Sequence, residues 1–238
     1  MHFSNVLAIA RTPSKSEDFR ELIVRTVPNN LKVDTRCYGQ LTDTQEIHAH
    51  YRAIIIEIDT PSASNQTLDI IRKTRTENPG GTIFVVVTFA STLSKTKYYL
   101  AGADYCIKVL ETSPEKKLSL FDEFLSESAR LTQCGLVLDQ DRMCIYGDGK
   151  RLEISFVEMK VLEALIHSRL LSHNEIAGVM GLNTKYYDSR ALEKSISRLR
   201  SKIKAHCGEN IIQNIRGYGY KLSRGLICAS HCHPAKER

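Results

Sequence analysis

The sequence predicts two domains of different class: a doubly wound α/β domain with a five-stranded parallel sheet, followed by a smaller α+β domain. Three observations lead to this prediction. The first half alternates continuous apolar runs with amphipathic stretches, the second half begins with short strands separated by turn residues, and the whole excess of positive charge lies in the second half. A chain of 238 residues is long enough for each domain to have its own core.

Five strand–helix units are predicted in the first half. The strands are expected at 5–10, 31–37, 53–58, 82–90 and 105–110, and the helices at 16–27, 42–49, 65–77, 93–101 and 114–130. Runs such as AIIIEI and TIFVVVTFA are continuously apolar, which indicates a parallel sheet covered on both faces. The functional site of such a sheet is expected at the carboxyl ends of its strands.

The second half has shorter elements. Strands are predicted at 135–139, 143–147 and 151–155, helices at 156–168, 172–180 and 190–205, and a closing hairpin at the Gly-Tyr-Gly-Tyr run. The last helix of the first half is followed by SARLTQCG, where we expect the domain boundary. The predicted division is 1–128, 132–225 and a loose polar tail at 226–238.

The helix predicted at 190–205 carries two different faces. Its apolar stripe consists of Leu192, Ile196, Leu199 and Ile203. A second face offers cations and small polar groups, namely Arg190, Lys194, Ser197, Arg198 and Ser201. A helix anchored by one side and presenting such groups on another can enter a DNA major groove. Arg216, at the tip of the predicted hairpin, is a second cation that could probe a groove.

The charge distribution supports a nucleic-acid partner over an ordinary solvated helix. Up to residue 130 there are 16 Lys and Arg against 16 Asp and Glu, and from 131 onward 17 against 11. A neutral first domain and a basic second one indicate a separate module that binds a polyanion. A membrane surface is a weaker interpretation, because no Trp or Phe flanks the basic face.

Other classes of protein are disfavoured by what the sequence lacks. We expect a cytoplasmic protein, because the sequence shows no segment of transmembrane length and no signal peptide. Seven cysteines without a framework pattern predict reduced, mostly buried thiols. The tail cluster of Cys228, His231, Cys232 and His233 is crowded and has no second ligand pair, so we expect no metal there. We expect neither a cofactor nor catalysis, because no nucleophile–base pair and no Gly-rich phosphate loop is visible.

The segments RALEKSISRLRSKI and NIRGYGYKL resemble the recognition helix and the wing of OmpR/PhoB-type response regulators. With the first half, the resemblance covers nearly the whole chain and implies a flavodoxin-like receiver joined to a winged helix-turn-helix domain. The DNA-binding residues that it implies are Arg190, Lys194, Ser197, Arg198, Arg200, Arg216 and Tyr220. Arg190 and Arg200 would hold phosphates, Lys194 and Arg198 would face bases, and Arg216 would enter the minor groove.

Two further roles follow from the same resemblance. Tyr220 would support the wing or touch the DNA backbone. The stretch from Leu182 to Ser189, which contains Tyr186 and Tyr187, resembles the loop that the family uses to contact RNA polymerase. Lys194 occupies a position that is usually apolar in the family, so the family's DNA sequence preference is not carried over.

The receiver pocket departs from the family pattern. The resemblance places it at Ala10, Arg11, Glu57, Thr88 and Lys108. Glu57 occupies the phosphoacceptor position, Ala10 and Arg11 stand where an acidic pair holds Mg²⁺, and Val109 replaces a proline. A hard divalent cation would have too few oxygen ligands here, so we expect no metal and no phosphotransfer.

Two interpretations of Glu57 stay open. It could reach toward Thr88 and Lys108 and imitate the phosphorylated state, with Arg11 replacing the metal's charge through a carboxylate–guanidinium pair. Alternatively, these residues changed freely once phosphorylation had become dispensable. Asp59, two residues downstream, is a substitute acceptor without a supporting metal pair.

The resemblance also implies a way to dimerise. In the active form of the family, Thr88 and an aromatic switch residue, here Tyr105, move together, and receivers pair through the fourth helix, fifth strand and fifth helix. The charged residues expected near this face are Lys95, Lys97, Asp104, Asp122 and Glu123. Opposite charges on both elements permit reciprocal salt bridges across a two-fold axis. We expect a homodimer that forms without phosphorylation and binds two DNA half-sites.

The leading prediction is therefore a sequence-specific transcription regulator that acts without phosphate from a histidine kinase. One alternative is a conventional two-component regulator that is switched by phosphorylation of Asp59 or Glu57. Another is an interaction protein whose receiver senses a protein partner or a small effector, with the basic domain serving for docking.

Overall fold

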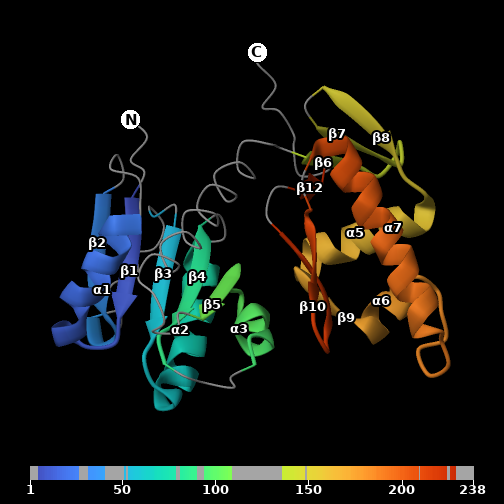
Figure 1. Cartoon of the computed structure of the whole chain (residues 1–238). Helices are drawn as coiled ribbons and strands as arrows, with labels where there is room; N and C mark the ends of the chain where they lie inside the picture. The colour runs from blue at the N-terminus through green and yellow to red at the C-terminus, as the bar shows by residue number, and fades with distance from the viewer. Residues whose placement is uncertain are drawn as a thin grey trace. The chain divides into compact units, whose positions relative to one another are not determined.

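The computed structural model describes residues 5–26, 32–40, 51, 53–78, 81–89, 94–108, 136–147, 149–208, 210–223 and 226–228. The chain divides into two compact units, unit 1 (Met1–Ser128) and unit 2 (Ala129–Arg238) (Figure 1). The helices predicted at 42–49 and 114–130 lie outside the described residues. No helix in the described part of the chain is both long and apolar enough to cross a membrane.

Unit 1 is a parallel α/β domain, as predicted. Its elements are β1 (Asn5–Ala10), α1 (Pro13–Thr26), β2 (Lys32–Cys37), η1 (Tyr38–Gln40), β3 (Ala53–Ile58), η2 (Pro61–Ala63), α2 (Ser64–Glu77), β4 (Thr82–Val87), α3 (Thr96–Ala101) and β5 (Tyr105–Lys108). The strand order is β2-β1-β3-β4-β5, with every neighbouring pair parallel. The order reverses between β1 and β3, so the topological switch point lies at the carboxyl ends of these two strands.

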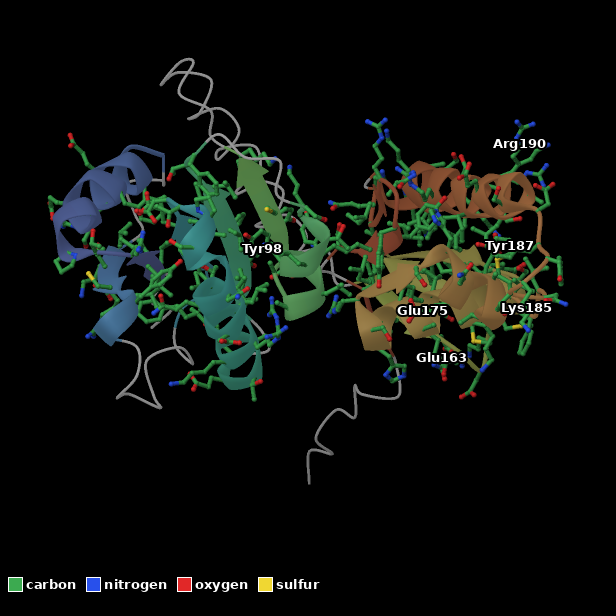
Figure 2. All side chains as sticks on the ribbon, turned by 90° about the horizontal axis from the view of Figure 1, so that it is seen from below. Tyr98, Glu163, Glu175, Lys185, Tyr187 and Arg190 are labelled. Atoms are coloured by element: carbon green, nitrogen blue, oxygen red, sulfur yellow. The ribbon has the colours of Figure 1, made fainter. Side chains whose placement is uncertain are left out.

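The continuous apolar runs are explained by cover on both faces of this sheet. All six residues of β3 and all six of β4 are buried. Ile54 and Ile56 pack on one face with Tyr98 of α3, which has no exposed surface (Figure 2), whereas Ile55 packs on the other face with Phe19 of α1. Helix α1 begins at Pro13, three residues earlier than predicted, because a proline is well accommodated in the first turn of a helix.

Unit 2 is an α+β domain with two small sheets. Its elements are β6 (Leu136–Asp139), β7 (Cys144–Gly147), β8 (Lys150–Glu153), α5 (Phe156–Ser168), β9 (Leu170–Ser172), α6 (His173–Val179), α7 (Ser189–Cys207), β10 (Ile212–Ile215), β11 (Gly219–Leu222) and β12 (Leu226–Cys228). One sheet has the order β12-β6-β7-β8 and the other β10-β11-β9.

Two strands of unit 2 correct the sequence prediction. Strand β9 begins at Leu170, in a stretch with no predicted strand, and pairs with β11. The predicted loose tail at 226–238 is wrong at its start, because β12 pairs in parallel with β6. The apolar Leu226 gains a ladder position and complete burial there, which a solvated tail would not provide.

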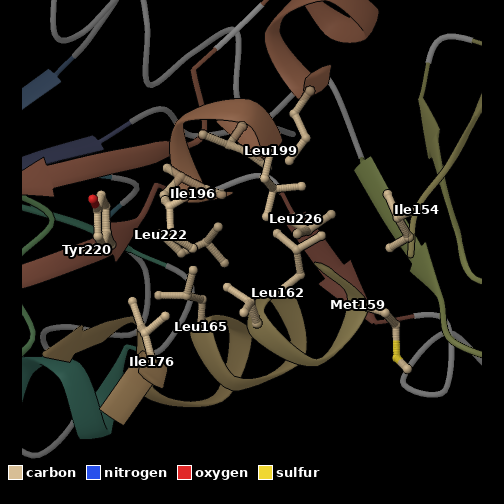
Figure 3. Close-up of a cluster of buried hydrophobic side chains, with 14 of the residues drawn as sticks. Ile154, Met159, Leu162, Leu165, Ile176, Ile196, Leu199, Tyr220, Leu222 and Leu226 are labelled. Atoms are coloured by element: carbon tan, nitrogen blue, oxygen red, sulfur yellow. The ribbon is translucent and has the colours of Figure 1, made fainter. Parts of the chain in front are cut away.

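Helix α7 is anchored on the core of unit 2 by its predicted apolar stripe. Leu192, Ile196, Leu199 and Ile203 are each at most 2% exposed and belong to one cluster with residues of α5 and β11. Figure 3 shows Ile196 and Leu199 above Leu162 of α5. The Asp188 side chain accepts the N–H of Arg190 in the first turn of the helix, and Gly208 ends it with a φ of 76°. The opposite side of α7 is therefore held in a fixed orientation toward solvent.

Candidate functional site

The structure gathers the predicted basic residues on the solvent side of α7. Arg190, Lys194, Ser197 and Arg198 are all exposed, and their spacing of three or four residues places them on one side of the helix. Arg190 projects from the N-terminal end of α7 (Figure 2). The exposed strip thus combines three cations with a small hydroxyl side chain on a rigid helix.

Two other cations of α7 brace the helix from its flanks. The Nε of the partly buried Arg200 donates to Asn210 Oδ1 over 3.3 Å, in the connection to β10. Lys202 Nζ forms an ion pair of 3.0 Å with Glu158 of α5. Burial works to raise the pKa of Glu158, but hydrogen bonds from Ser155 and Lys202 outweigh it, so this pKa lies below its ordinary value.

The hairpin β10–β11 forms the wing. Arg216 is exposed in its turn, where Gly217 has a φ of 75° that favours glycine. Tyr220 is only 3% exposed, and its ring lies nearly perpendicular to that of His173, with ring centroids 5.5 Å apart. Burial raises the pKa of Tyr220. Of the two roles considered for Tyr220, this position fits support of the wing from within the core.

Sequence reasoning missed the junction between the wing and α6. The backbone N–H of His173, the first residue of α6, donates to the Tyr218 carbonyl over 3.0 Å. The next residue, Asn174, accepts a 3.0 Å bond from the Tyr187 hydroxyl in the loop before α7. The amino end of α6 therefore ties the wing to the start of the basic helix. The signal that could have placed it is the Ser172–Glu175 capping box.

At the switch point of unit 1, Arg11 bridges two loops. Its Nη1 donates to Thr60 Oγ1 over 2.8 Å and lies 3.6 Å from Asp59 Oδ1. The Arg11 side chain is 37% exposed and that of Asp59 only 5%. One of the two open interpretations of Glu57 paired it with Arg11, whereas the ion pair that the structure forms is with Asp59, which lies beyond the end of β3 where the chain turns toward η2. Ala10, beside Arg11, is completely buried.

Glu57 and Thr88 are brought together at the ends of β3 and β4. Thr88 Oγ1 lies 3.4 Å from Glu57 Oε1 and 3.3 Å from the Ile58 carbonyl, so its single proton has two acceptors. Glu57 is 6% exposed. Lys108, partly buried, ends β5 opposite Val87. Tyr105 is buried and stacks on Phe84 with ring centroids 5.0 Å apart.

The charges expected on the pairing face are only partly available. Asp104 is used inside unit 1, where its Oδ2 lies 2.6 Å from Arg75 Nη2 and accepts the Ile83 N–H over 2.8 Å. Lys97 Nζ lies 5.0 Å above the ring of Tyr98, and Lys95 is exposed. Our expectation that Asp104 contributes to a surface charge pattern is therefore corrected, whereas Asp122 and Glu123 lie outside the described residues.

The remaining candidate ligands and reactive groups are the cysteine thiols and the predicted tail cluster. Cys37, Cys106 and Cys144 are buried free cysteines. Within the described ranges, no group of three or more His, Cys, Asp or Glu residues could hold a metal ion. His231, Cys232 and His233 lie outside these ranges, and so does the side chain of Cys228.

The chain is similar in sequence to one protein family and to several response regulators. Residues 149–222 match the family described as "transcriptional regulatory protein, C terminal". The two-component response regulator PhoP of Pseudomonas aeruginosa is 25% identical over 179 residues, which cover 72% of this chain and 78% of PhoP. The response regulator ArlR of Staphylococcus aureus is 24% identical over 210 residues, which cover 85% of this chain and 93% of ArlR. The structure of DrrB, an OmpR/PhoB homologue of Thermotoga maritima, has 16% identity and a TM-score of 0.41, covering 93% of this chain and 99% of DrrB.

A five-stranded parallel α/β unit followed by a domain with an exposed basic helix and a hairpin is the architecture of a receiver joined to a winged helix-turn-helix. The match at 149–222 and the similarity to PhoP and ArlR agree with this architecture, so the chain is similar to DNA-binding response regulators of the OmpR/PhoB type. Its winged domain lies in unit 2 and its receiver is unit 1.

Proposed function

We propose that this response regulator controls transcription as a receiver-paired dimer and does so without phosphorylation. The observation that carries the proposal is the Arg11 bridge at the switch point. A guanidinium that is held by Thr60 over 2.8 Å and by Asp59 over 3.6 Å supplies a permanent positive charge in the pocket. In other members of the family, that charge would come from a metal ion.

The residues of this pocket do not fit a divalent metal. The Ala10 side chain offers no ligand atom, Arg11 is a cation, and the Asp59 carboxylate already faces the Arg11 guanidinium. Hard cations such as Mg²⁺ need several oxygen ligands in octahedral geometry and are repelled by a neighbouring guanidinium. The same ion pair counts against Asp59 as a substitute acceptor, because a phosphoryl group would need a metal ion to neutralise it.

The test adds beryllofluoride and Mg²⁺ to the full-length protein. We expect its DNA affinity and its oligomeric state, measured by light scattering, to stay unchanged. ArlR, tested in parallel, serves as a control for the reagent. A dimer that forms only after addition of the mimic would instead support the conventional, phosphorylation-switched alternative.

For DNA recognition we propose that the exposed strip of α7 enters the major groove. Arg190 would contact phosphate and Lys194 would face a base edge. A phosphate contact adds affinity on every sequence and increases the salt dependence of binding, whereas a base contact distinguishes one sequence from another. The proposed roles of Arg190 and Lys194 can therefore be distinguished by experiment.

We expect Arg190→Ala to weaken binding to all DNA and to lower the slope of log affinity against log salt by about 1. Lys194→Ala should cost about 1–3 kcal/mol on a fragment selected by the wild-type protein, and much less on unrelated DNA. Salt titrations on both fragments check this. Lys150→Ala, which removes an exposed charge from β8 in the same unit, is the control. Equal losses for Lys194→Ala and Lys150→Ala would contradict the assignment.

For dimerisation we propose a face built on α3 and β5. Leu100 of α3 is 57% exposed, although the neighbouring Tyr98 is fully buried. An exposed leucine beside lysines could bury its side chain against a second copy, and the surrounding charges would set the orientation. Exposed ion pairs contribute only about 0–1 kcal/mol each, so the apolar contact should matter more.

Leu100→Ser should therefore weaken the dimer, because a buried leucine contributes about 1.5–3 kcal/mol. This corresponds to a dissociation constant raised by at least tenfold in sedimentation measurements. Val24→Ser, at a 47% exposed position on α1, removes a comparable apolar side chain from another element and should have no effect. If both variants dimerise like the wild type, the pairing face lies elsewhere.

A contact with RNA polymerase is proposed for the loop between α6 and α7. Tyr186 is 85% exposed there, and Leu182 is exposed as well. Large exposed aromatic side chains favour protein–protein contacts. This loop precedes the DNA-facing end of α7, so a polymerase bound beside the operator could reach it.

A further inference from the structure

Strand β3 extends beyond its ladder with β1. The carbonyl of Ile58 points toward β4 and accepts the Thr88 N–H over 3.0 Å. Successive carbonyls of a strand point to opposite sides, so the carbonyl of Glu57 points toward β1. The pairing of β1 with β3 ends at Ile9 and Ile56, just before Glu57. A buried carbonyl at the end of a ladder can accept a hydrogen bond from a side-chain donor.

Tyr38 supplies that donor. Its hydroxyl donates to the Glu57 carbonyl from η1, which follows β2, the strand on the far side of β1. Tyr38 is 3% exposed and packs in the core cluster of that face of the sheet. Burial raises the pKa of Tyr38 well above its ordinary value, so the hydroxyl keeps its proton at every physiological pH.

The same hydroxyl is connected to the start of α2. Tyr38 Oη lies 2.9 Å from Thr67 Oγ1, and Thr67 donates to the Ala63 carbonyl over 2.8 Å. Either hydroxyl can be the donor in the contact between Tyr38 and Thr67. Tyr38 thus joins the end of β3 to α2 at the switch point of the sheet, 19 residues away from Glu57 in the chain.

Glu57 is consequently held at two places. Tyr38 holds its main chain from the β1 side, and Thr88 contacts its carboxylate from the β4 side at 3.4 Å. We propose that Tyr38 is a positioning residue, which fixes the Glu57 backbone so that the carboxylate stays against Thr88 and the receiver keeps one conformation. The inference rests on the proposed function, in which Glu57 and Arg11 replace a phosphorylation switch.

The experiment compares two tyrosine-to-phenylalanine variants of the full-length protein. Tyr38→Phe removes the hydroxyl at Glu57 and keeps the ring. Tyr51→Phe, the control, removes a hydroxyl that donates to Asp34 Oδ2 over 2.9 Å in the same unit. The readout is the methyl signal of Thr88 in protein labelled at threonine methyl groups, identified by its absence in Thr88→Val.

We expect Tyr38→Phe to shift or split the Thr88 signal, because the Glu57 carbonyl loses the bond from Tyr38 and the carboxylate samples other positions. Tyr51→Phe should leave this signal in place. A merely structural hydroxyl would lower stability in both variants without moving the Thr88 signal. An unchanged Thr88 signal in folded Tyr38→Phe would therefore overturn the proposal.

A third variant tests whether a general loosening of the core could explain a changed Thr88 signal. Thr67→Val removes the hydroxyl that contacts Tyr38 and leaves the bond from Tyr38 to Glu57, so the Thr88 signal should stay single. A split signal in Thr67→Val would mean that packing around α2, and not the bond to Glu57, positions Thr88. That result would also overturn the proposal.

The dimer gives a second readout and separates two kinds of failure. The loss of one buried hydrogen bond should raise the dissociation constant of the dimer about fivefold in Tyr38→Phe, and not in Tyr51→Phe. A wild-type chain that dimerises only with beryllofluoride would refute the proposed function, whereas the Thr88 signal would still report whether Tyr38 positions Glu57.

Discussion

Replacing Gly219 with alanine should disrupt the wing and cost about 3 kcal/mol in the unfolding of unit 2. A Cβ added at this position would lie 2.0 Å from the Leu171 carbonyl oxygen and 2.7 Å from Ser172 Cα. Both atoms belong to the backbone of β9, so no rotation of a side chain can relieve the clash. Strand β11 would have to move away from β9, to which it pairs at Gly219 and Ser172.

This displacement should also lower DNA affinity. The backbone N–H of His173 donates to Tyr218, so the wing turn that carries Arg216 is positioned from the same junction. We expect Gly219→Ala to bind DNA at least tenfold more weakly at a temperature at which unit 2 is still folded. Thermal unfolding followed by circular dichroism and a DNA titration at low temperature measure the two effects separately.

The matched control is Gly217→Ala, two residues earlier, in the turn of the same hairpin. Nothing lies within 4 Å of its added Cβ, and only the φ of 75° opposes the substitution. The expected cost is about 1 kcal/mol. If the two variants were equally stable, the close approach of β11 and β9 would not be the reason for a glycine at position 219.

The fold could be predicted from the sequence because its main elements have strong local signals. The six-residue apolar runs of β3 and β4 and the stripe from Leu192 to Ile203 each indicate their own structure without reference to distant residues. Strands β9 and β12 have three residues each, too few for a period to be recognised. They exist because β11 and β6 offer a strand edge, and such pairing depends on the tertiary fold.

In the candidate site, too, positions that follow from local spacing could be predicted, whereas contacts between distant segments could not. The exposed strip of α7 follows from helical spacing alone, so Arg190, Lys194 and Arg198 lie where the sequence indicates. The partners of Arg11 and Tyr38 could not be read from spacing. Arg11 pairs with Asp59, just beyond the end of β3, and not with Glu57, as one of the two open interpretations had it. Tyr38 contacts a main-chain carbonyl, an interaction that no side-chain pattern records.

Arg75 is another residue that the sequence did not single out, and its loss should destabilise unit 1 by about 3 kcal/mol. From the last turn of α2, its Nε and Nη2 both donate to the Gly102 carbonyl, over 3.0 and 2.8 Å, and its Nη1 donates to the Gly81 carbonyl over 2.8 Å. Its Nη2 also lies 2.6 Å from Asp104 Oδ2. One guanidinium thus connects α2 to the start of β4 and to the turn before β5.

Truncation of Arg75 to alanine would remove these bonds together. The Asp104 carboxylate would keep its bond from the Ile83 N–H but would lose its positive partner in a site that is only 14% exposed. Removing the guanidinium beside a largely buried carboxylate costs more than the small net contribution of an exposed ion pair. Because Asp104 directly precedes Tyr105, we also expect Tyr105 to pack less firmly on Phe84.

Arg72→Ala is the control on the same helix. Arg72 pairs with Asp69 over 3.0 Å, and both side chains are well exposed. Such a pair contributes only about 0–1 kcal/mol, so this variant should unfold close to the wild type. Urea titrations of the full-length variants, with hydrogen exchange to assign each transition to its unit, provide the measurement. Arg75→Ala should shift the transition of unit 1 and leave that of unit 2 in place, the reverse of Gly219→Ala. A shift no larger than that of Arg72→Ala would mean that the Arg75 contacts contribute little to the stability of the receiver.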